Sequence, residues 1–130
     1  MPLEVEIEYE RGLPVYRQIV EAVLAALSTG RLAREEQLPT IHELAARLDV
    51  NPNTVARAYR ELEREGHIIA RRGRGTFAAP APPGSADTVD REAVLRDIYL
   101  RAIADGARYA IGAREIARYF RRAAHEPDAR

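Results

Sequence analysis

The amino-acid sequence predicts a mainly α-helical chain that contains one small β-hairpin. An apolar stripe at helical spacing spans residues 14–29, and two shorter helix patterns follow at 40–49 and 51–65. Two short β-prone runs within 67–79 flank a turn rich in arginine and glycine. Three helices followed directly by a hairpin are typical of a winged helix-turn-helix domain. Two further helix patterns lie beyond residue 87, so a helical region is expected after that domain.

Composition limits the class of protein. The 130 residues suit one domain or two very small ones, and 46% hydrophobic with 31% charged residues indicates a folded chain. The absence of cysteine excludes disulfides and cysteine metal sites. No apolar run reaches membrane-spanning length, and the first ten residues are acidic rather than signal-like. We therefore expect no membrane association and a cytoplasmic location.

The N-terminal part is expected to contain a strand and a helix. Apolar residues alternate with glutamates over residues 3–9, which predicts a short half-exposed strand. A helix is expected from Pro14 to Thr29, because proline favours the first helical position and Gly30 favours a helix end. Its apolar stripe consists of Tyr16, Ile19, Val20, Val23, Leu24 and Leu27. Residues 31–38 are interpreted as a loop or a short strand.

The next two helices form the predicted helix-turn-helix. Thr40 and Glu43 have the spacing of a capping box, which predicts a short helix up to about residue 49. Asn51 is expected to cap the following helix, with a proline as its first residue and Gly66 after its end. Only three or four residues separate the two helices, as in a helix-turn-helix.

The hairpin and the C-terminal region complete the predicted organisation. The runs 67–70 and 76–79 are predicted strands, which closes a first domain over residues 1–79. The proline-rich residues 80–86 are expected to be a linker. Residues 87–130 are expected to form a helical region. There, Thr88 or Asp90 caps a helix that is interrupted near Gly106, and a last helix covers about 113–124.

The N-terminus of the second helix of the pair carries candidate DNA contacts. In a helix-turn-helix this end faces base edges in the major groove. Here it offers Asn51, Asn53 and Thr54, and Arg57 follows one turn later on the face of Asn53. Amides can read adenine, a threonine methyl can contact thymine, and arginine can read guanine. The alternative is that Asn51 and Thr54 only cap the helix and that Arg57 lies on a solvated face.

Two further segments are candidates for contacts with the DNA backbone. The hairpin tip contains Arg71, Arg72, Gly73 and Arg74, which as a wing would meet phosphates or enter the minor groove. An arginine-rich turn that is simply solvated is the alternative. Thr40 could offer its hydroxyl or backbone N–H to a phosphate, or serve as a cap and nothing more.

Six motifs occur in order at a spacing that resembles the DNA-binding domain of the GntR family of bacterial transcriptional regulators. They are Pro14–Ile19, Leu38–Thr40, Glu43–Ala45, Val50–Val55, Tyr59–Glu63 and Arg72–Phe77. The resemblance covers about residues 10–79 closely. The Asn-Pro-Asn-Thr segment and the short C-terminal region resemble the YtrA subfamily. This resemblance implies a transcriptional regulator, typically a repressor, that binds a pseudo-palindromic operator as a homodimer.

One residue departs from the family pattern. The family usually has an arginine at the position of His42, and that arginine commonly contacts DNA. Histidine is shorter and mostly neutral at pH 7. Two interpretations therefore stay open, in which His42 contacts DNA or is a structural surface residue.

The C-terminal region is predicted to be a dimerisation region. Its apolar stripes are wide for two helices, so surplus apolar surface needs a partner. The predicted dimer residues are Leu95, Ile98, Tyr99, Ala102, Ile103, Ile116, Tyr119 and Phe120. The alternative is that these helices fold back onto the first domain of the same chain. About 45 residues are too few to enclose an ordinary metabolite pocket within one chain, and any small-molecule effector is unknown.

Other functional classes have less support. The three histidines have no metal-ligand spacing, the two serines lie in poor settings for a nucleophile, and phosphate-binding and dinucleotide fingerprints are missing. We therefore expect no enzyme, no catalytic residue, no metal and no cofactor. A formal net charge of zero favours one alternative, a protein-interaction or architectural module. Another alternative is a repressor with a small-ligand site at the dimer interface.

Overall fold

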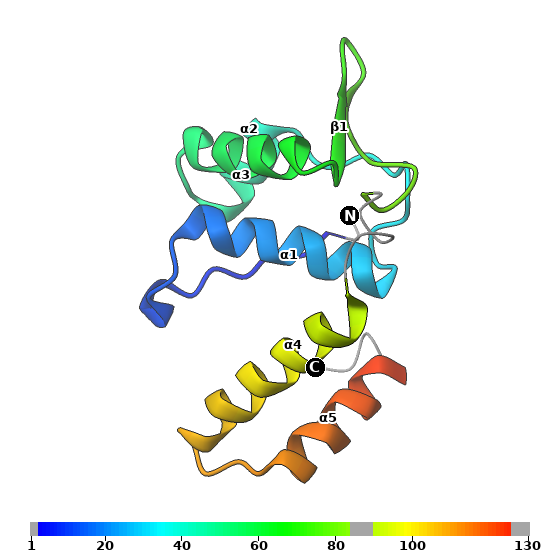
Figure 1. Cartoon of the computed structure of the whole chain (residues 1–130). Coiled ribbons are helices and arrows are strands. Elements are labelled where there is room, and N and C mark those ends of the chain that lie inside the picture. The colour runs from blue at the N-terminus through cyan, green and yellow to red at the C-terminus, as the bar shows by residue number, and fades with distance from the viewer. Residues whose placement is uncertain (1–2, 84–89, 126–130) are drawn as a thin grey trace. The chain divides into compact units, whose positions relative to one another are not determined.

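The computed structural model describes residues 3–83 and 90–125 (Figure 1). The chain divides into two compact units, Met1–Pro83 and Gly84–Arg130. The first unit contains a short 3-10 helix, three α-helices and a two-stranded sheet: η1 (Tyr9–Arg11), α1 (Val15–Thr29), α2 (Ile41–Leu48), α3 (Pro52–Arg64), β1 (Ile68–Arg71) and β2 (Gly75–Ala78). The second unit contains α4 (Arg91–Ala107) and α5 (Ala113–His125). The mainly helical fold with one small hairpin is confirmed.

The strand predicted over residues 3–9 is wrong. Residues 3–8 are extended but pair with no strand in the part of the chain that the structure describes, and the 3-10 helix η1 begins at Tyr9. The alternation of apolar and acidic residues reflects side-chain burial instead. Leu3 is fully buried, and Val5 and Ile7 pack partly against the same core. The segment therefore packs as an arm on the helices without joining a sheet.

A buried glutamine provides this segment with backbone hydrogen bonds that a sheet would otherwise supply. Gln18 in α1 donates from Nε2 to the carbonyl oxygens of Glu8 and Leu13, each at 2.9 Å. Its Oε1 accepts a bond of 2.8 Å from the backbone N–H of Glu8. Because a buried amide needs such partners, Gln18 fixes the approach of the chain to α1.

The three helices of the first unit start and stop close to the predicted positions. Pro14 is the N-cap of α1 and not its first helical residue, as had been predicted. Gly30 ends the helix with φ of 80°. The predicted capping box of α2 is confirmed, because Thr40 and Glu43 exchange both side chain to backbone bonds. Asn51 caps α3 as predicted, with its Oδ1 accepting from the backbone N–H of Asn53 at 2.8 Å.

The core of the first unit lies between these helices and the hairpin. Its largest fully buried side chains include Ile19, Val23, Leu32, Leu38, Leu44, Val55, Leu62 and Ile68. Each such side chain contributes about 1.5–3 kcal/mol relative to an exposed one. Tyr59 of α3 adds a buried hydrogen bond, because its hydroxyl donates to the carbonyl oxygen of Pro39 at 2.7 Å. Burial raises the pKa of Tyr59 well above its usual value, so the hydroxyl stays a donor.

The hairpin has the predicted antiparallel pairing, with bounds shifted by one residue. Its register runs from Ile68 opposite Ala78 to Arg71 opposite Gly75, which leaves three residues in the tip. Residues 31–38, for which the sequence left a loop or a short strand as alternatives, form a loop with one bridge, Gln37 opposite Phe77. Backbone bonds from residues 35–38 to β2 nevertheless fix the base of the hairpin.

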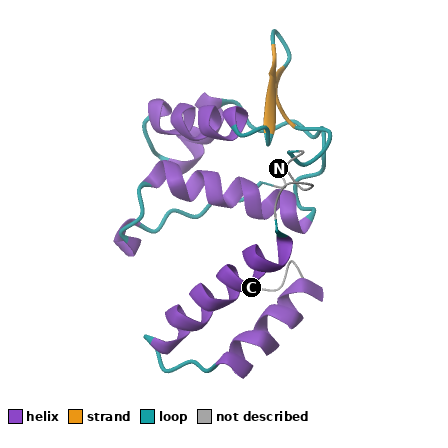
Figure 2. Cartoon of the chain, in the orientation of Figure 1, coloured by secondary structure: helices purple, strands orange, loops and turns teal. Residues whose placement is uncertain are grey.

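The second unit is a helical hairpin of α4 and α5 (Figure 2). Asp90 caps α4 by accepting from the backbone N–H of Ala93 at 3.2 Å, whereas Thr88 lies outside the described residues. α4 ends at Ala107, in agreement with the interruption predicted near Gly106, and this glycine lies buried in its last turn. A Cβ there would lie 2.5 Å from Cδ1 of Ile116, so the glycine permits the close approach of α5.

The boundary between the units lies later than the predicted end of the first domain. Ala79 is buried and donates its backbone N–H to the carbonyl oxygen of His67 at 3.0 Å. Pro83 packs near Gly66. The first unit therefore reaches Pro83, and residues 84–86 of the predicted linker lie outside the described residues.

Candidate nucleic-acid interface

The structure brings the four predicted major-groove residues together at the N-terminus of α3. They surround one open polar hollow of about 470 Å³. Its lining residues are Val15, Tyr16, Asn51, Asn53, Thr54, Arg57 and Arg60. The hollow therefore joins the start of α1 to the start of the second helix of the helix-turn-helix.

The polar residues at this helix start differ in how far their side chains are engaged in the helix cap. The Oδ1 of Asn51 is engaged in the cap, and Thr54 is half-buried with its backbone N–H bonded to the carbonyl oxygen of Asn51 at 2.9 Å. Asn53 is exposed and contributes its backbone N–H to the cap, so its side-chain amide is not needed there. Because adenine is read by an amide oxygen and nitrogen together, Asn53 is the stronger candidate for that contact.

Arg57 has a neighbour that sequence reasoning missed. Its guanidinium carbon lies 3.8 Å from the centroid of the Tyr16 ring, which is a cation–π stack. Tyr16 was assigned to the apolar stripe of the first helix, and it does pack partly against the core. The same ring also carries Arg57. Helical spacing reports which residues share a face of one helix, so it gave no signal for this contact between two helices.

The N-terminus of α2 has fewer free groups for a phosphate than predicted. The backbone N–H of Thr40 donates to Oε1 of Glu43 at 3.2 Å, and its hydroxyl accepts from the backbone N–H of Glu43 at 3.1 Å. Of the two groups proposed for a phosphate, the N–H is thus engaged by a carboxylate, and the hydroxyl keeps its proton as a donor. His42 is exposed two residues later, which is compatible with both interpretations of its role.

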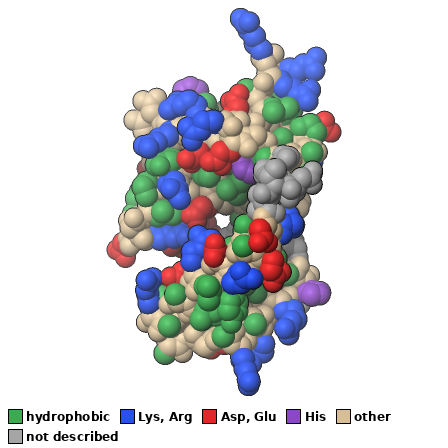
Figure 3. Space-filling view, viewed as in Figure 1, with side chains coloured by type: hydrophobic (Ala, Val, Ile, Leu, Met, Phe, Trp, Pro, Cys, Tyr) green, Lys and Arg blue, Asp and Glu red, His purple; other side chains and the backbone are tan. Residues whose placement is uncertain are grey.

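The hairpin tip presents its basic residues to solvent. Arg72 and Arg74 are exposed in the tip, where Gly73 has φ of 76°, and Arg71 is exposed at the end of β1 rather than in the tip itself. Figure 3 shows basic side chains at the end of the hairpin and over the helices beside it. Gln37, which the sequence did not single out, donates from Nε2 to the carbonyl oxygen of Arg74 at 3.0 Å. The tip is thus tied to the loop that precedes α2.

Charge is segregated along α3 although the chain has a formal net charge of zero. Arg57 and Arg60 are exposed and line the polar hollow. At the far end Arg64 lies 3.8 Å from a carboxylate oxygen of Glu61, outside the polar hollow. The zero sum therefore does not describe the end of α3 that would face DNA.

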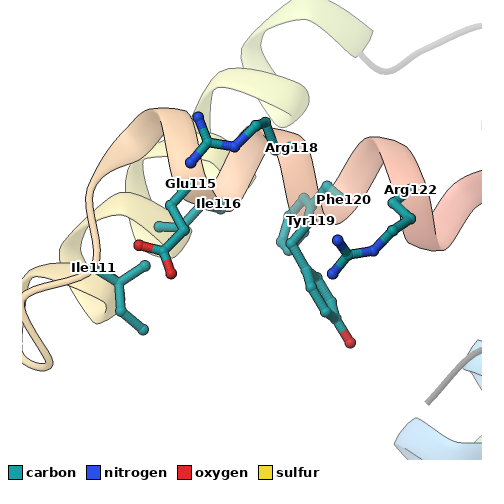
Figure 4. A pocket seen from close by; sticks show the side chains of 7 residues that line it. All are labelled: Ile111, Glu115, Ile116, Arg118, Tyr119, Phe120 and Arg122. Atoms are coloured by element: carbon teal, nitrogen blue, oxygen red, sulfur yellow. The ribbon is translucent and has the colours of Figure 1, made fainter.

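The predicted dimer residues gather on the second unit. Seven of them line one groove of about 240 Å³ between α4 and α5, together with Ala113 and Ala117. Leu95, Tyr99 and Phe120 are 58%, 55% and 55% exposed. The eighth, Tyr119, lines a second hollow of about 450 Å³ on α5, which Figure 4 shows with Phe120 and flanking arginines.

Metal-binding clusters and membrane-spanning helices are absent from the described ranges 3–83 and 90–125. There, no three His, Cys, Asp or Glu side chains are grouped so that they could hold a metal ion. No helix in these ranges is both long enough and apolar enough to cross a membrane.

The sequence is similar to one known protein family and to individual bacterial regulators. The model of the bacterial regulatory proteins of the gntR family matches residues 15–78. The uncharacterized HTH-type transcriptional regulator YhcF of Bacillus subtilis is 35% identical over 99 residues, which are 76% of this chain and 76% of YhcF. The HTH-type transcriptional repressor YtrA of Bacillus subtilis is 41% identical over 73 residues, which are 56% of each chain.

Solved structures resemble both units. A transcriptional antiterminator from Listeria monocytogenes EGD-e matches with a TM-score of 0.71 and 32% identity over 94% of this chain and 90% of that chain. YtrA from Sulfolobus acidocaldarius, a GntR-family transcription factor, matches with a TM-score of 0.60 and 34% identity over 77% and 97%. AraR(DBD) in complex with operator ORX1 matches with a TM-score of 0.53 and 29% identity over 59% and 96%.

Proposed function

Because this chain belongs to the GntR family of bacterial regulatory proteins and is YtrA-like within it, we propose that it is a transcriptional repressor that binds a pseudo-palindromic operator as a homodimer. The observation that carries the proposal is the cluster of Asn53, Thr54 and Arg57 at the capped start of α3. An operator complex of the related AraR domain supports duplex DNA as the ligand. Such DNA would be met in the cytoplasm.

The geometry supports a division of roles on DNA. In the major groove, Asn53 would read adenine, Thr54 would contact a thymine methyl and Arg57 would read guanine. At the wing, Arg71, Arg72 and Arg74 would neutralise phosphates or enter the minor groove, and Gly73 would let the backbone approach.

The unfilled apolar groove of the second unit supports a homodimer. The groove between α4 and α5 leaves half of the Leu95, Tyr99 and Phe120 surfaces in solvent. A second copy related by a two-fold axis would cover them with identical residues. Such a dimer presents two copies of α3 to half-sites about one helical turn apart, which is why the expected operator is pseudo-palindromic.

Selection from a random duplex library, long enough for two half-sites, tests the DNA-binding proposal. The full chain should enrich an inverted repeat, and its affinity should fall steeply as salt rises. Arg57→Ala should cost about 1–3 kcal/mol and relax the preference at one base pair of each half-site. Arg72→Ala should weaken all duplexes alike and reduce the salt slope by about 1 per site contacted.

Arg64→Ala is the matched control, because Arg64 lies on the same helix but is paired with Glu61. Its affinity and specificity should equal those of the unchanged chain. Retention of selective binding in both Arg57→Ala and Arg72→Ala would refute the assignment of α3 and the hairpin tip as the surface that contacts DNA. A chain that enriches no sequence would refute the repressor and favour a protein-interaction role.

A further inference from the structure

A contact between α1 and α3 connects the hydrophobic core to the polar hollow at the start of α3. Arg57 is exposed on α3, yet its guanidinium carbon lies 3.8 Å from the ring centroid of Tyr16 on α1. Tyr16 is half-buried and packs against the hydrophobic core. A long side chain that would otherwise sample many rotamers is thus held against a fixed surface.

The chemistry of the stack leaves the reading groups of Arg57 available. A guanidinium stacks through its planar face, whereas its five N–H donors point outward in the plane. Two parallel donors are what a guanine edge accepts. The ring therefore fixes the plane of the guanidinium without consuming the donors that would contact a base.

The position of the stack indicates that Arg57 is oriented for contact with a ligand. Tyr16 and Arg57 both line the polar hollow that contains Asn53 and Thr54. Because the ring is anchored in α1, the direction of the arginine depends on the packing of α1 against α3 as well as on α3 itself.

We propose that Tyr16 is a positioning residue that orients Arg57 and thereby determines specificity at the base pair which Arg57 reads. The proposal rests on the proposed function, since it assumes that α3 reads duplex DNA. It assigns to Tyr16 a role through its ring, which Phe can replace and an aliphatic residue cannot.

The test compares Tyr16→Phe and Tyr16→Leu in the full chain. The base pair is defined as the one whose preference is lost in Arg57→Ala after duplex selection. Tyr16→Leu should lower the affinity ratio between the best duplex and one substituted at that pair by roughly three- to tenfold, while Tyr16→Phe should retain it. In the Arg57→Ala background Tyr16→Leu should have no further effect on this ratio.

A measurement on the free protein tests the stack without DNA. In the NMR spectrum of the unchanged chain, the Arg57 Hδ and Hε resonances should shift upfield through the ring current of Tyr16. Tyr16→Phe should keep this shift. If the unchanged chain lacks it, the stack and the proposal are both wrong, even where Tyr16→Leu proves too unstable to assay.

The remaining outcomes separate the two proposals. A uniform loss of affinity in Tyr16→Leu, with the ratio intact, would mean that Tyr16 supports the fold or a phosphate and does not position Arg57. An intact ratio in Tyr16→Leu beside a relaxed one in Arg57→Ala would overturn this inference alone. If the unchanged chain selects no duplex, the proposed function fails as well.

Discussion

The two units of this chain differ in where their apolar side chains lie. In the unit Met1–Pro83, the helices α1, α2 and α3 bury their apolar faces against one another and against the hairpin. In α4 and α5, Gly106 is the one buried residue among those described, and the large apolar side chains stay largely exposed. Both units consist largely of α-helices, so secondary structure alone does not explain the difference.

The number of packed elements explains the difference. An apolar stripe needs a facing surface, and the first unit provides one for each helix within the same chain. Two helices in a hairpin cover only part of each other, so the apolar arc of α4 exceeds what α5 can cover. The comparison therefore assigns the buried hydrophobic core to the first unit and, under the proposed function, assembly to the second.

The largest expected effect contrasts two leucines. Leu62 is fully buried in α3 and Leu100 is exposed in α4. Leu62→Ala should reduce the free energy of unfolding by about 2–5 kcal/mol through lost burial and a cavity. Leu100→Ala should change it by less than about 0.5 kcal/mol. Urea unfolding at one fixed protein concentration measures both, and equal effects would mean that the comparison of the units is wrong.

The second effect concerns assembly. Phe120→Glu places a charge in the groove between α4 and α5, so a covering partner would have to bury it. We expect the dimer dissociation constant to rise roughly 30-fold or more, corresponding to about 2 kcal/mol. Sedimentation velocity reads the change directly, with exposed Tyr109 outside the groove changed to Glu as a control. A chain that is monomeric before any substitution would favour the alternative in which the helices fold back.

The third effect tests the packing of α4 on α5 with two glycines. A Cβ at Gly106 would lie 2.5 Å from Cδ1 of Ile116 and 2.9 Å from the carbonyl oxygen of Ile111, whereas Gly112 has nothing within 4 Å. Gly106→Ala should cost about 1–3 kcal/mol through overpacking, against a helix-propensity gain of up to about 1 kcal/mol. Gly112→Ala should be neutral. Faster hydrogen exchange of α5 amides in the first variant alone is the expected observation.

Local signals in the sequence predicted most of the first unit. The capping box of Thr40 and Glu43 and the Asn51 cap act within four residues, so their spacing alone determined where α2 and α3 begin. The hairpin was predictable for the same reason. The strand over residues 3–9 was not, because period-two burial does not reveal whether a neighbouring strand exists.

The residues of the candidate site were also only partly predictable from the sequence. Asn53 and Thr54 were predictable because helix position determines their place in a helix-turn-helix. Tyr16 and Gln37 were not, because each acts across the fold, on Arg57 and on the carbonyl of Arg74. The close contact of Gly106 with Ile116 was not predictable for a related reason, since it exists only after α5 folds back.

The smallest expected effect removes one hydroxyl from each unit. Tyr59 donates a buried hydrogen bond to the carbonyl oxygen of Pro39, whereas Tyr99 is exposed in α4. Tyr59→Phe should lower the free energy of unfolding by about 1 kcal/mol, because a buried carbonyl loses its donor. Tyr99→Phe should leave it unchanged.

The unfolding free energies of Tyr59→Phe and Tyr99→Phe should also differ in their pH dependence. Burial raises the pKa of Tyr59 in the folded chain, while an unfolded tyrosine ionises near pH 10. The unfolded state therefore binds fewer protons above that pH, and the contribution of Tyr59 to stability, complete below pH 10, falls as pH rises further. Unfolding curves at several alkaline pH values should be less pH-dependent for Tyr59→Phe than for Tyr99→Phe. Identical dependence in both variants would mean that Tyr59 is not buried between α2 and α3, and that the first unit is as incompletely packed as the second.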